Sequence, residues 1–420
     1  MKKIIFLLIL CLSVACEKSD QLEHKPGQLL DYKIEPINGG ATISYTLPAK
    51  SDILYVMAKY LRGGETFTER SSFYNNSLTI EGFNTTDPVE ALLYTVNREG
   101  VSSDPLKISF EPLESPLKIA FRSLEITKGF AGIVAKWENH TKTELGVRLM
   151  VEENDVLKDH DMYFSSLEAE SHAFRGFDDT EKTFAVSLED KWGNVSDTLF
   201  LTTTPYFETE VPKPFGDMRS TIPFDITTQN PTFNWPRLFN KAVGDDSWLT
   251  TTPTSAKPQL CGFTIDLMQV YKLSRMTLWP RMRPNNHNDV YAVNNVLAFE
   301  MWGTRKIDNS KLSDRAYWLD EYQDWITFEP GLEVPDHTFK DDWIYLGYYE
   351  VERLDLKGAT PTDIMNRALQ GEPFDIPIDL EPVRYIRFFP RETDKGSPTP
   401  GAIFQIAELS FFGDNKIPQE

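Results

Sequence analysis

One loop in the second half of the chain carries side chains of the types that bind sugars. It places a tryptophan near two arginines, amide side chains and a histidine, among prolines that would stiffen it. A flat aromatic face can pack on the C–H groups of a pyranose ring, while planar donors and acceptors meet its hydroxyls. The candidate carbohydrate-binding residues are Trp279, Arg281, Arg283, Asn286 and His287. The alternative is an irregular crossover in which Trp279 belongs to the core and the arginines pair with acids.

Two further segments, 302–306 and 343–349, also place aromatic residues beside polar ones. Trp302 ends an apolar run of the kind that forms a buried strand, so a core position is the simpler interpretation for it. We therefore rank both segments behind the loop as binding candidates.

No pattern in the sequence indicates catalysis. The chain has 63 Asp and Glu residues, but no spacing singles out a glycosidase pair, which must lie ~5–9.5 Å apart across a cleft. The six histidines form no His-x-x-x-His pair, and neither a Gly-x-Ser-x-Gly elbow nor a phosphate loop occurs. We therefore predict no catalytic residues and a protein that is not an enzyme.

The elements that must position these residues are predicted to be strands. Short alternating apolar runs are separated by Gly, Pro and Asn, and two stretches share one plan. Segment 40–47 matches 132–139, segment 54–60 matches 145–151, and the closing strand and turn at 91–103 match 184–196. Chance similarity between two hairpins is the alternative explanation. The plan resembles tandem fibronectin type III-like (immunoglobulin-like) sandwiches over residues 26–113 and 114–205.

Prolines mark the joints between these units. Residues 111–116 form a stiff, extended hinge, and residues 205–236 hold six prolines without a helical or strand period. Residues 206–229 are therefore predicted to be a linker or a segment that wraps along the next domain. Residues 230–414 are predicted to form one larger β domain, with a short helix at 363–369 that ends at Gly371.

Four signatures in residues 230–414 occur in the order typical of the factor V/VIII type C family. They are an opening loop at 242–248, the strand Ile265-Asp266-Leu267, the strand Arg384-Tyr385-Ile386-Arg387 and the final strand 408–413. Met268 stands where the family has glycine. The region resembles this discoidin-like (galactose-binding-like) domain, which is a β jelly roll. The predicted fold class is therefore all-β, with two sandwiches followed by a jelly roll.

The same resemblance implies a structural Ca²⁺ ion between the opening loop and the final strand. Asp245, Asp246 and Glu408 would supply the carboxylate oxygens that Ca²⁺ prefers. Val243 replaces an aspartate that the family usually has, which removes one expected ligand. Acidic loop residues that are merely solvated are the alternative.

The N-terminus predicts export. Residues 1–15 have a basic start followed by the apolar run 4–12, which is too short to span a bilayer. The residues before Cys16 resemble the lipobox of bacterial lipoproteins, in which this cysteine is lipidated; ordinary signal cleavage is the alternative. The acidic residues after it resemble the tag that sends Bacteroidetes lipoproteins to the outer face of the outer membrane, and 16–25 would form a tether. Cys261 then remains as a single thiol, so no intrachain disulfide is expected.

The net charge of −20 disfavours nucleic acid as a partner, because the chain repels phosphate backbones. The whole organisation resembles multidomain surface lipoproteins encoded beside starch-utilisation-type uptake systems. This resemblance implies capture of extracellular polysaccharide for an outer-membrane transporter, and a largely neutral ligand would bind with little dependence on salt. A structural or assembly protein that contacts the transporter is the main alternative, and a glycoside hydrolase is a weaker one.

Overall fold

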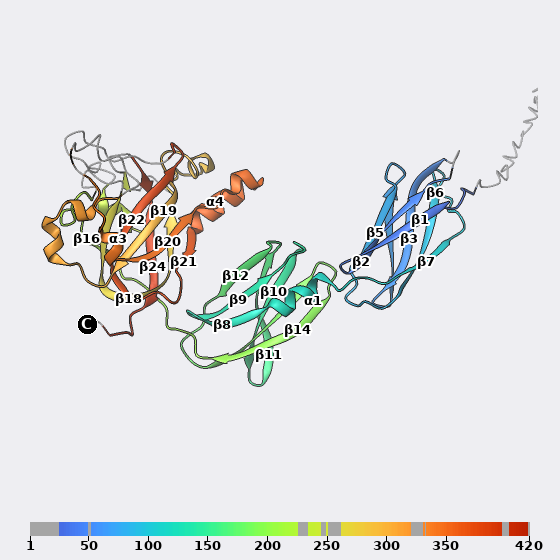
Figure 1. The fold of residues 1–420 in the computed structure, drawn as a ribbon, viewed down its shortest axis with the longest axis horizontal. Coiled ribbons are helices and arrows are strands. Elements are labelled where there is room, and N and C mark those ends of the chain that lie inside the picture. The colour runs from blue at the N-terminus through green and yellow to red at the C-terminus, as the bar shows by residue number, and fades with distance from the viewer. Residues whose placement is uncertain are drawn as a thin grey trace, which may run out of the picture. The chain divides into compact units, whose positions relative to one another are not determined.

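The computed structural model describes residues 25–48, 52–225, 234–244, 249–250, 262–320, 331, 333–396 and 403–418. Predictions for the leader, for Cys16 and Cys261, and for Asp245 and Asp246 lie outside these residues. The described chain consists mainly of antiparallel strands, which confirms the all-β fold class (Figure 1). Among the helices in the described part, none is long and apolar enough to cross a membrane.

The first sandwich contains two sheets, with the orders β1-β2-β5 and β4-β3-β6-β7. Its strands are β1 Asp31–Ile37, β2 Gly40–Thr46, β3 Ile53–Arg62, β4 Glu65–Ser72, β5 Ser77–Glu81, β6 Val89–Asn97 and β7 Leu106–Phe110. The inward positions of the alternating runs, such as Ile43, Val56 and Leu93, are buried in one core cluster. The period of two therefore sets which face of each strand is buried.

The second sandwich has sheets of the orders β12-β9-β8 and β11-β10-β13-β14. Its elements are α1 Pro116–Ser123, β8 Glu125–Gly129, β9 Gly132–Glu138, β10 Leu145–Glu153, β11 Val156–Ser165, β12 Ala169–Phe174, β13 Lys182–Asp190 and β14 Val195–Thr203. Helix α1 begins where the hinge was expected to be extended. Ser115 caps it by accepting the Lys118 N–H at 3.2 Å, and Pro116 occupies the first helical position, where no amide hydrogen is needed.

The turn after β6 in the first sandwich and the turn after β13 in the second have the same hydrogen bonds. The side-chain Oδ1 of Asn97 accepts the backbone N–H groups two and four residues later, and Asp190 does the same in the second turn. Ser103 and Ser196 each accept the backbone N–H eight residues earlier, at 3.1 and 2.8 Å. The shared sequence ending therefore encodes a shared hydrogen-bond pattern.

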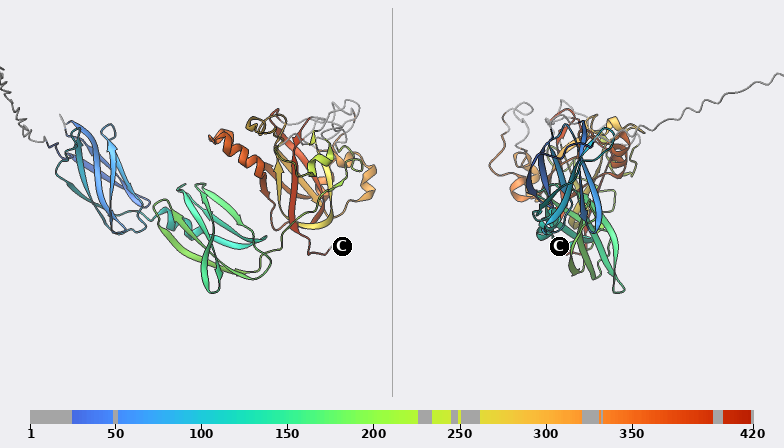
Figure 2. Two further views of the ribbon diagram at one scale, coloured as in Figure 1. Left: turned by 180° about the vertical axis from the view of Figure 1, so that it is seen from behind. Right: turned by 90° about the vertical axis from the view of Figure 1, so that its right-hand side faces the viewer.

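The remaining strands form a third β region (Figures 1 and 2). Its main sheet has the order β15-β24-β18-β22-β19-β20. Its strands are β15 Thr209–Glu210, β16 Gly216–Asp217, β17 Leu249–Thr250, β18 Phe263–Trp279, β19 Val296–Thr304, β20 Ile344–Glu350, β21 Glu372–Asp375, β22 Val383–Thr393, β23 Gln405–Ile406 and β24 Glu408–Asp414. Its helices and 3₁₀ turns are η1 Trp235–Phe239, η2 His287–Asp289, η3 Asn309–Ser313, η4 Ala316–Trp318, α3 Phe339–Asp342, η5 Leu354–Lys357 and α4 Pro361–Gln370.

The proline-rich segment after residue 205 lies along this third region. Strand β15 pairs with β24, strand β16 pairs with β18, and Val211 and Phe215 lie in the core. Helix α4 extends the expected 363–369 helix, with Thr360 and Asp363 forming a capping box and Gly371 following it. Strand β18 is one long strand of 17 residues with a register shift between Asp266 and Tyr271.

The two faces of strand β22 meet different cores. Phe388 packs with Phe263 and Phe299 in the main cluster, and Phe389 packs with Phe339 in an aromatic cluster on the other face. Because β22 lies between β18 and β19, Tyr385 at its start is in register with both Asp266 of β18 and Thr304 of β19. This register brings the β18 bulge, the end of β19 and the start of β22 together.

Candidate functional site

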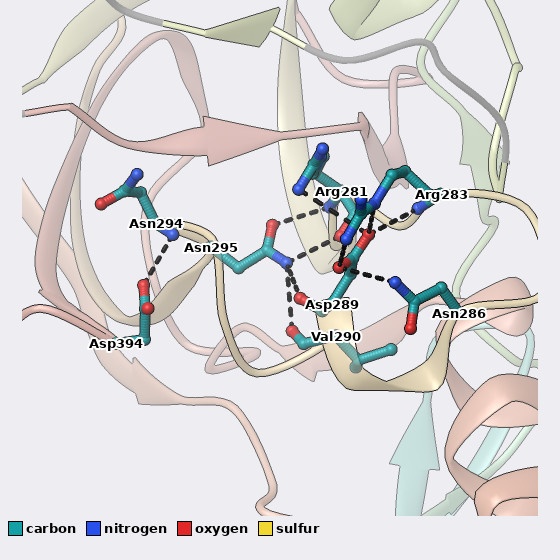
Figure 3. A network of polar contacts seen from close by, with 8 residues as sticks. All are labelled: Arg281, Arg283, Asn286, Asp289, Val290, Asn294, Asn295 and Asp394. Carbon is teal, nitrogen blue, oxygen red and sulfur yellow. Dashed lines mark hydrogen bonds and ion pairs between the residues drawn. The ribbon is translucent and has the colours of Figure 1, made fainter.

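The predicted sugar-binding loop, residues 279–289, is organised around Asp289; we call it the Asp289 loop (Figure 3). The Asp289 side chain is 3% exposed, and its two oxygens accept Nε and Nη2 of Arg283, each at 2.8 Å. Asn286 Nδ2 donates to the same carboxylate at 3.0 Å, and Arg281 Nη1 lies 3.7 Å from it. The Arg283 side chain lowers the pKa of Asp289, with a smaller contribution from the Arg281 charge, so the acid stays ionised.

Asn295 ties the backbone of the Asp289 loop together. Its Oδ1 accepts the Arg281 N–H at 2.7 Å, and its Nδ2 donates to the carbonyls of Arg281 and Asp289, each at 2.8 Å. These bonds satisfy backbone groups that would otherwise be buried without partners. The loop is therefore held by its own polar side chains.

Trp279 and His287 complete the predicted set. The Trp279 indole Nε1 donates to the Leu369 carbonyl at 3.1 Å, and its ring lies against Gly371, where an added Cβ would come within 2.5 Å of it. Gly371 has φ +83°, so both its conformation and its close approach to the ring require glycine. His287 is partly exposed at the start of η2. The structure thus brings Arg281, Arg283 and Asn286 together around an acid, as in the alternative interpretation, while Trp279 contacts the end of α4 and Gly371. Their role in sugar binding stays a prediction.

Glu408, the described member of the predicted calcium set, has a cationic partner. Its Oε1 accepts the Lys213 ammonium, and its Oε2 accepts the Lys241 N–H at 3.0 Å. Burial raises the pKa of Glu408, while the Lys213 hydrogen bond and charge oppose that rise. In the described part of the chain, no group of three or more His, Cys, Asp or Glu side chains is arranged to hold a metal ion. The calcium site stays a prediction.

A groove of about 860 Å³ opens at the junction of β18, β19 and β22, and we call it the Tyr385 groove. It is lined by Met218, Thr221, Met268, Gln269, Val270, Arg305, Lys306, Ile307, Asn309, Leu312, Arg384 and Tyr385. These side chains offer a ring face, thioethers and aliphatic groups together with N–H and hydroxyl donors. A concave site of this size and mixture suits an oligosaccharide segment.

Met268 occupies a strained position at the groove. Its φ is +68°, in the left-handed region that glycine favours, and its N–H donates to Asp266 Oδ1 at 2.7 Å. The side chain is 59% exposed. Glycine would adopt this backbone conformation without strain, and this chain places an exposed thioether there instead.

The cations of the groove are held in different ways. Arg384 makes two 2.7 Å bonds to Asp266 and lies 5.0 Å from the centre of the Tyr385 ring. Arg305 donates to the Pro418 carbonyl, and Lys306 is exposed. Among the described residues that line the groove, three are cations and none is a carboxylate.

The groove residues were singled out by the sequence only in part and never as one site. The sequence singled out Arg384 and Tyr385 as part of a family signature and Met268 as a departure from another signature. Arg305 and Lys306 belonged to a segment ranked second as a binding candidate. These residues lie in one groove because β18, β22 and β19 are neighbours in the sheet. The hydrophobic periodicity of a single sequence predicts strands but not the order of strands in a sheet.

The other secondary aromatic residues lie beside a buried charge network. Trp302 donates its indole N–H to Glu300, and the centre of its ring lies 4.9 Å from the centre of the Tyr345 ring. Trp343 is buried in the aromatic cluster. Arg391 binds Glu300 at 2.8 Å and Asp320 at 2.5 Å, and Lys340 lies 3.1 Å from Asp320. Burial would raise the pKa of Asp320, but the two cations outweigh it and lower that pKa.

Three family models, each described as a domain of unknown function, match successive parts of the chain: DUF4959 over 26–112, DUF5126 over 113–214 and DUF5000 over 235–413. A search of curated proteins finds no match. Among solved structures, SusE-like protein BT2857 is 24% identical over 70% of this chain and 97% of its own, with a TM-score of 0.39.

Two chicken proteins are similar to the chain at 10% identity over 42% of its length. One is the interferon gamma receptor alpha chain, 98% of which is covered with a TM-score of 0.19. The other is a two-domain fibronectin type III segment of tenascin, 99% of which is covered with a TM-score of 0.21.

Proposed function

We propose that the protein is a lipid-anchored surface protein that binds extracellular polysaccharide for an outer-membrane uptake system without cleaving it. The Tyr385 groove is the observation that carries this proposal, because it joins a ring face and apolar side chains to hydrogen-bond donors in one concavity. The sequence around Cys16 supports the lipid anchor, and the strand-rich chain after it provides spacer domains.

A binding role fits Glu300 and Asp320, the buried carboxylates beside Trp302, better than hydrolysis does. Glu300 and Asp320 both bind Arg391, and the pKa of Asp320 lies below its ordinary value. A glycosidase requires one carboxylic acid that remains protonated near neutral pH, usually through a raised pKa. These two side chains therefore serve the stability of the domain in our proposal.

The test is calorimetry and affinity electrophoresis of the purified protein against a panel of neutral and acidic polysaccharides. We expect dissociation constants between about 1 µM and 1 mM, since a few stacking and hydrogen-bond contacts contribute only several kcal/mol. Prolonged incubation should release no sugar product. Failure to bind any polysaccharide would overturn the proposal, and product release would overturn its non-catalytic part.

An assembly role is the second candidate, and exposed apolar side chains of the second sandwich favour it. Phe164 on β11 and Phe200 on β14 are 61% and 56% exposed, and these strands form the two edges of one sheet. Large apolar side chains exposed on the edge strands of a sheet are available for contact with a partner protein. Co-purification with an outer-membrane transporter, with no binding to any polysaccharide, would favour this role over glycan capture.

A further inference from the structure

Two half-exposed tyrosines lie on strand β20, outside the Tyr385 groove. Tyr345 and Tyr348 are 47% and 48% exposed, and β20 is the last strand in the order of the main sheet. An open edge strand with apolar side chains invites contact with other molecules, so most natural edge strands carry charged residues instead. Two aromatic rings on such a strand are therefore candidates for contact with a ligand.

A β-bulge places both rings on one face of the sheet. On a regular strand, residues three apart point to opposite faces. Here the register shifts, so that Tyr345 lies opposite Trp302 and Tyr348 lies opposite Glu300, and these two β19 residues share a face. The extra residue, Leu346, is buried in the main core on the other face. The bulge thus aligns two tyrosines that regular alternation would separate.

The residues that follow Tyr345 hold this bulge in place. Gly347 has φ +138°, and a Cβ added there would come within 2.7 Å of the Tyr349 ring. The Tyr349 hydroxyl donates to the Leu346 carbonyl at 2.7 Å, and its ring stacks on Phe299, 5.3 Å away, in the main core. Bulges are frequent at sheet edges and beside functional sites, where they redirect side chains.

The two tyrosines extend into a third ring, and we call Trp302, Tyr345 and Tyr348 the β20 platform. The centres of the Trp302 and Tyr345 rings lie 4.9 Å apart. Burial raises the pKa of Tyr348, and the charges of Glu350 and Glu392 raise it further, so its hydroxyl stays protonated and can donate. The platform therefore offers flat rings for pyranose C–H groups and a hydroxyl for their oxygens.

The charges around the β20 platform favour a neutral ligand. Glu350 and Glu392 are exposed and close enough to act on Tyr348, so they would repel a carboxylate or sulfate on a sugar. Arg391, a cation that also acts on Tyr348, is bound to Glu300 at 2.8 Å. Ionised carboxylates accept hydrogen bonds from hydroxyls, which a neutral saccharide supplies in number.

We infer that the β20 platform is a second saccharide-binding surface, on which Tyr345 and Tyr348 stack against the pyranose rings of a neutral polysaccharide. This inference rests on the proposed function and adds a contact to it beyond the Tyr385 groove. Two contacts with one polymer bind it more tightly than either alone, because the second is made within the complex. Stacking involves no charge, so the affinity should change little with salt.

The test measures binding of the purified protein to dextran, galactomannan and xyloglucan by calorimetry, with polygalacturonate as the acidic comparison. Tyr345→Ala with Tyr348→Ala should weaken binding of the neutral polymer about tenfold. Tyr345→Phe with Tyr348→Phe keeps the ring faces and should weaken it by about twofold at most. Tyr74→Ala removes an 82% exposed tyrosine of the first sandwich and should change nothing. Thermal denaturation checks that each variant is folded.

Nitration of the native protein by tetranitromethane locates the contact without a substitution. A bound neutral polymer should lower the nitration of Tyr345 and Tyr348 severalfold and leave that of Tyr74 unchanged, as read by mass spectrometry. If a neutral polymer binds but neither the double Ala variant nor the nitration of these rings responds, the inference is wrong and the proposed function stands. Equal losses in the Phe and Ala variants, or binding of polygalacturonate alone, would also overturn it. Binding of no polysaccharide would overturn both.

Discussion

In the Asp289 loop, Arg281 and Arg283 point at a carboxylate that is 3% exposed, whereas Arg305 and Lys306 border an open volume of about 860 Å³. Both regions place aromatic residues near cations and amides, so composition does not separate them. The position and contacts of the nearest acidic side chains distinguish the two regions. A buried acid six residues after Arg283 turns the first set inward, whereas the acids beside the groove, Asp266 and Asp308, bond Arg384 and Ser310. The two regions therefore differ in how open they are: the first pair of cations surrounds a buried carboxylate, and the second pair lines an open groove.

The largest expected effect is loss of the acid that organises the loop. Asp289→Ala should lower the free energy of unfolding by about 3 kcal/mol, because it leaves Arg281 and Arg283 without the carboxylate they share. Urea denaturation measures this change. The control is Asp355→Ala, which breaks a pair with Arg353 whose side chains are 34% and 35% exposed, and should cost less than about 1 kcal/mol. The two carboxylates differ in exposure, 3% for Asp289 against 34% for Asp355, whereas Arg283 is itself 54% exposed. Similar losses in both variants would show that burial of the carboxylate does not set the cost.

The pH dependence of the same contact sharpens the comparison. Arg283 lowers the pKa of Asp289 in the folded state below the pKa of about 4 in the unfolded state. The ion pair therefore stabilises the folded protein fully above about pH 4, and this stabilisation is lost as the pH falls through the folded-state pKa. The stability difference between the native protein and Asp289→Ala should therefore shrink from pH 7 to about pH 3 in urea titrations. A difference that stays constant over this range would contradict the assigned pKa direction.

Two aromatic substitutions distinguish a residue that stabilises the fold from a residue that binds polysaccharide. Trp279→Ala should lower the free energy of unfolding by about 2 kcal/mol, since the ring packs on Gly371 and its indole bonds Leu369, and should leave polysaccharide affinity unchanged. Tyr385→Ala should weaken affinity about tenfold through loss of the ring face in the groove. Denaturation and calorimetry on both variants provide the two readouts. If Trp279→Ala abolishes binding in a folded protein, the Asp289 loop is the sugar site.

The strand pattern, the repeated sandwiches and the site of helix α4 could be predicted because each follows from local periodicity and capping residues. Asn97 and Asp190 form equivalent turns from equivalent sequence, so even their hydrogen bonds follow from the repeat. The groove could not be predicted, since Met268, Arg305 and Tyr385 meet only through the order β18-β22-β19. The inward turn of Arg283 was one of two open alternatives, because side-chain types alone do not say which partner is closest.

The smallest expected effect concerns Met268, the strained residue of the groove. Met268→Gly should raise the free energy of unfolding by up to about 1 kcal/mol, because relief of the left-handed conformation, about 1–2 kcal/mol, exceeds the entropic cost of glycine. It should also weaken polysaccharide binding about twofold through loss of the exposed thioether. Met268→Ala is the matched control, since it removes the same contact but keeps a Cβ at φ +68°. We expect it to share the loss of affinity without the gain in stability. Equal stability of the Gly and Ala variants would mean that the backbone at this position is unstrained, and an unchanged affinity in both would remove Met268 from the binding surface.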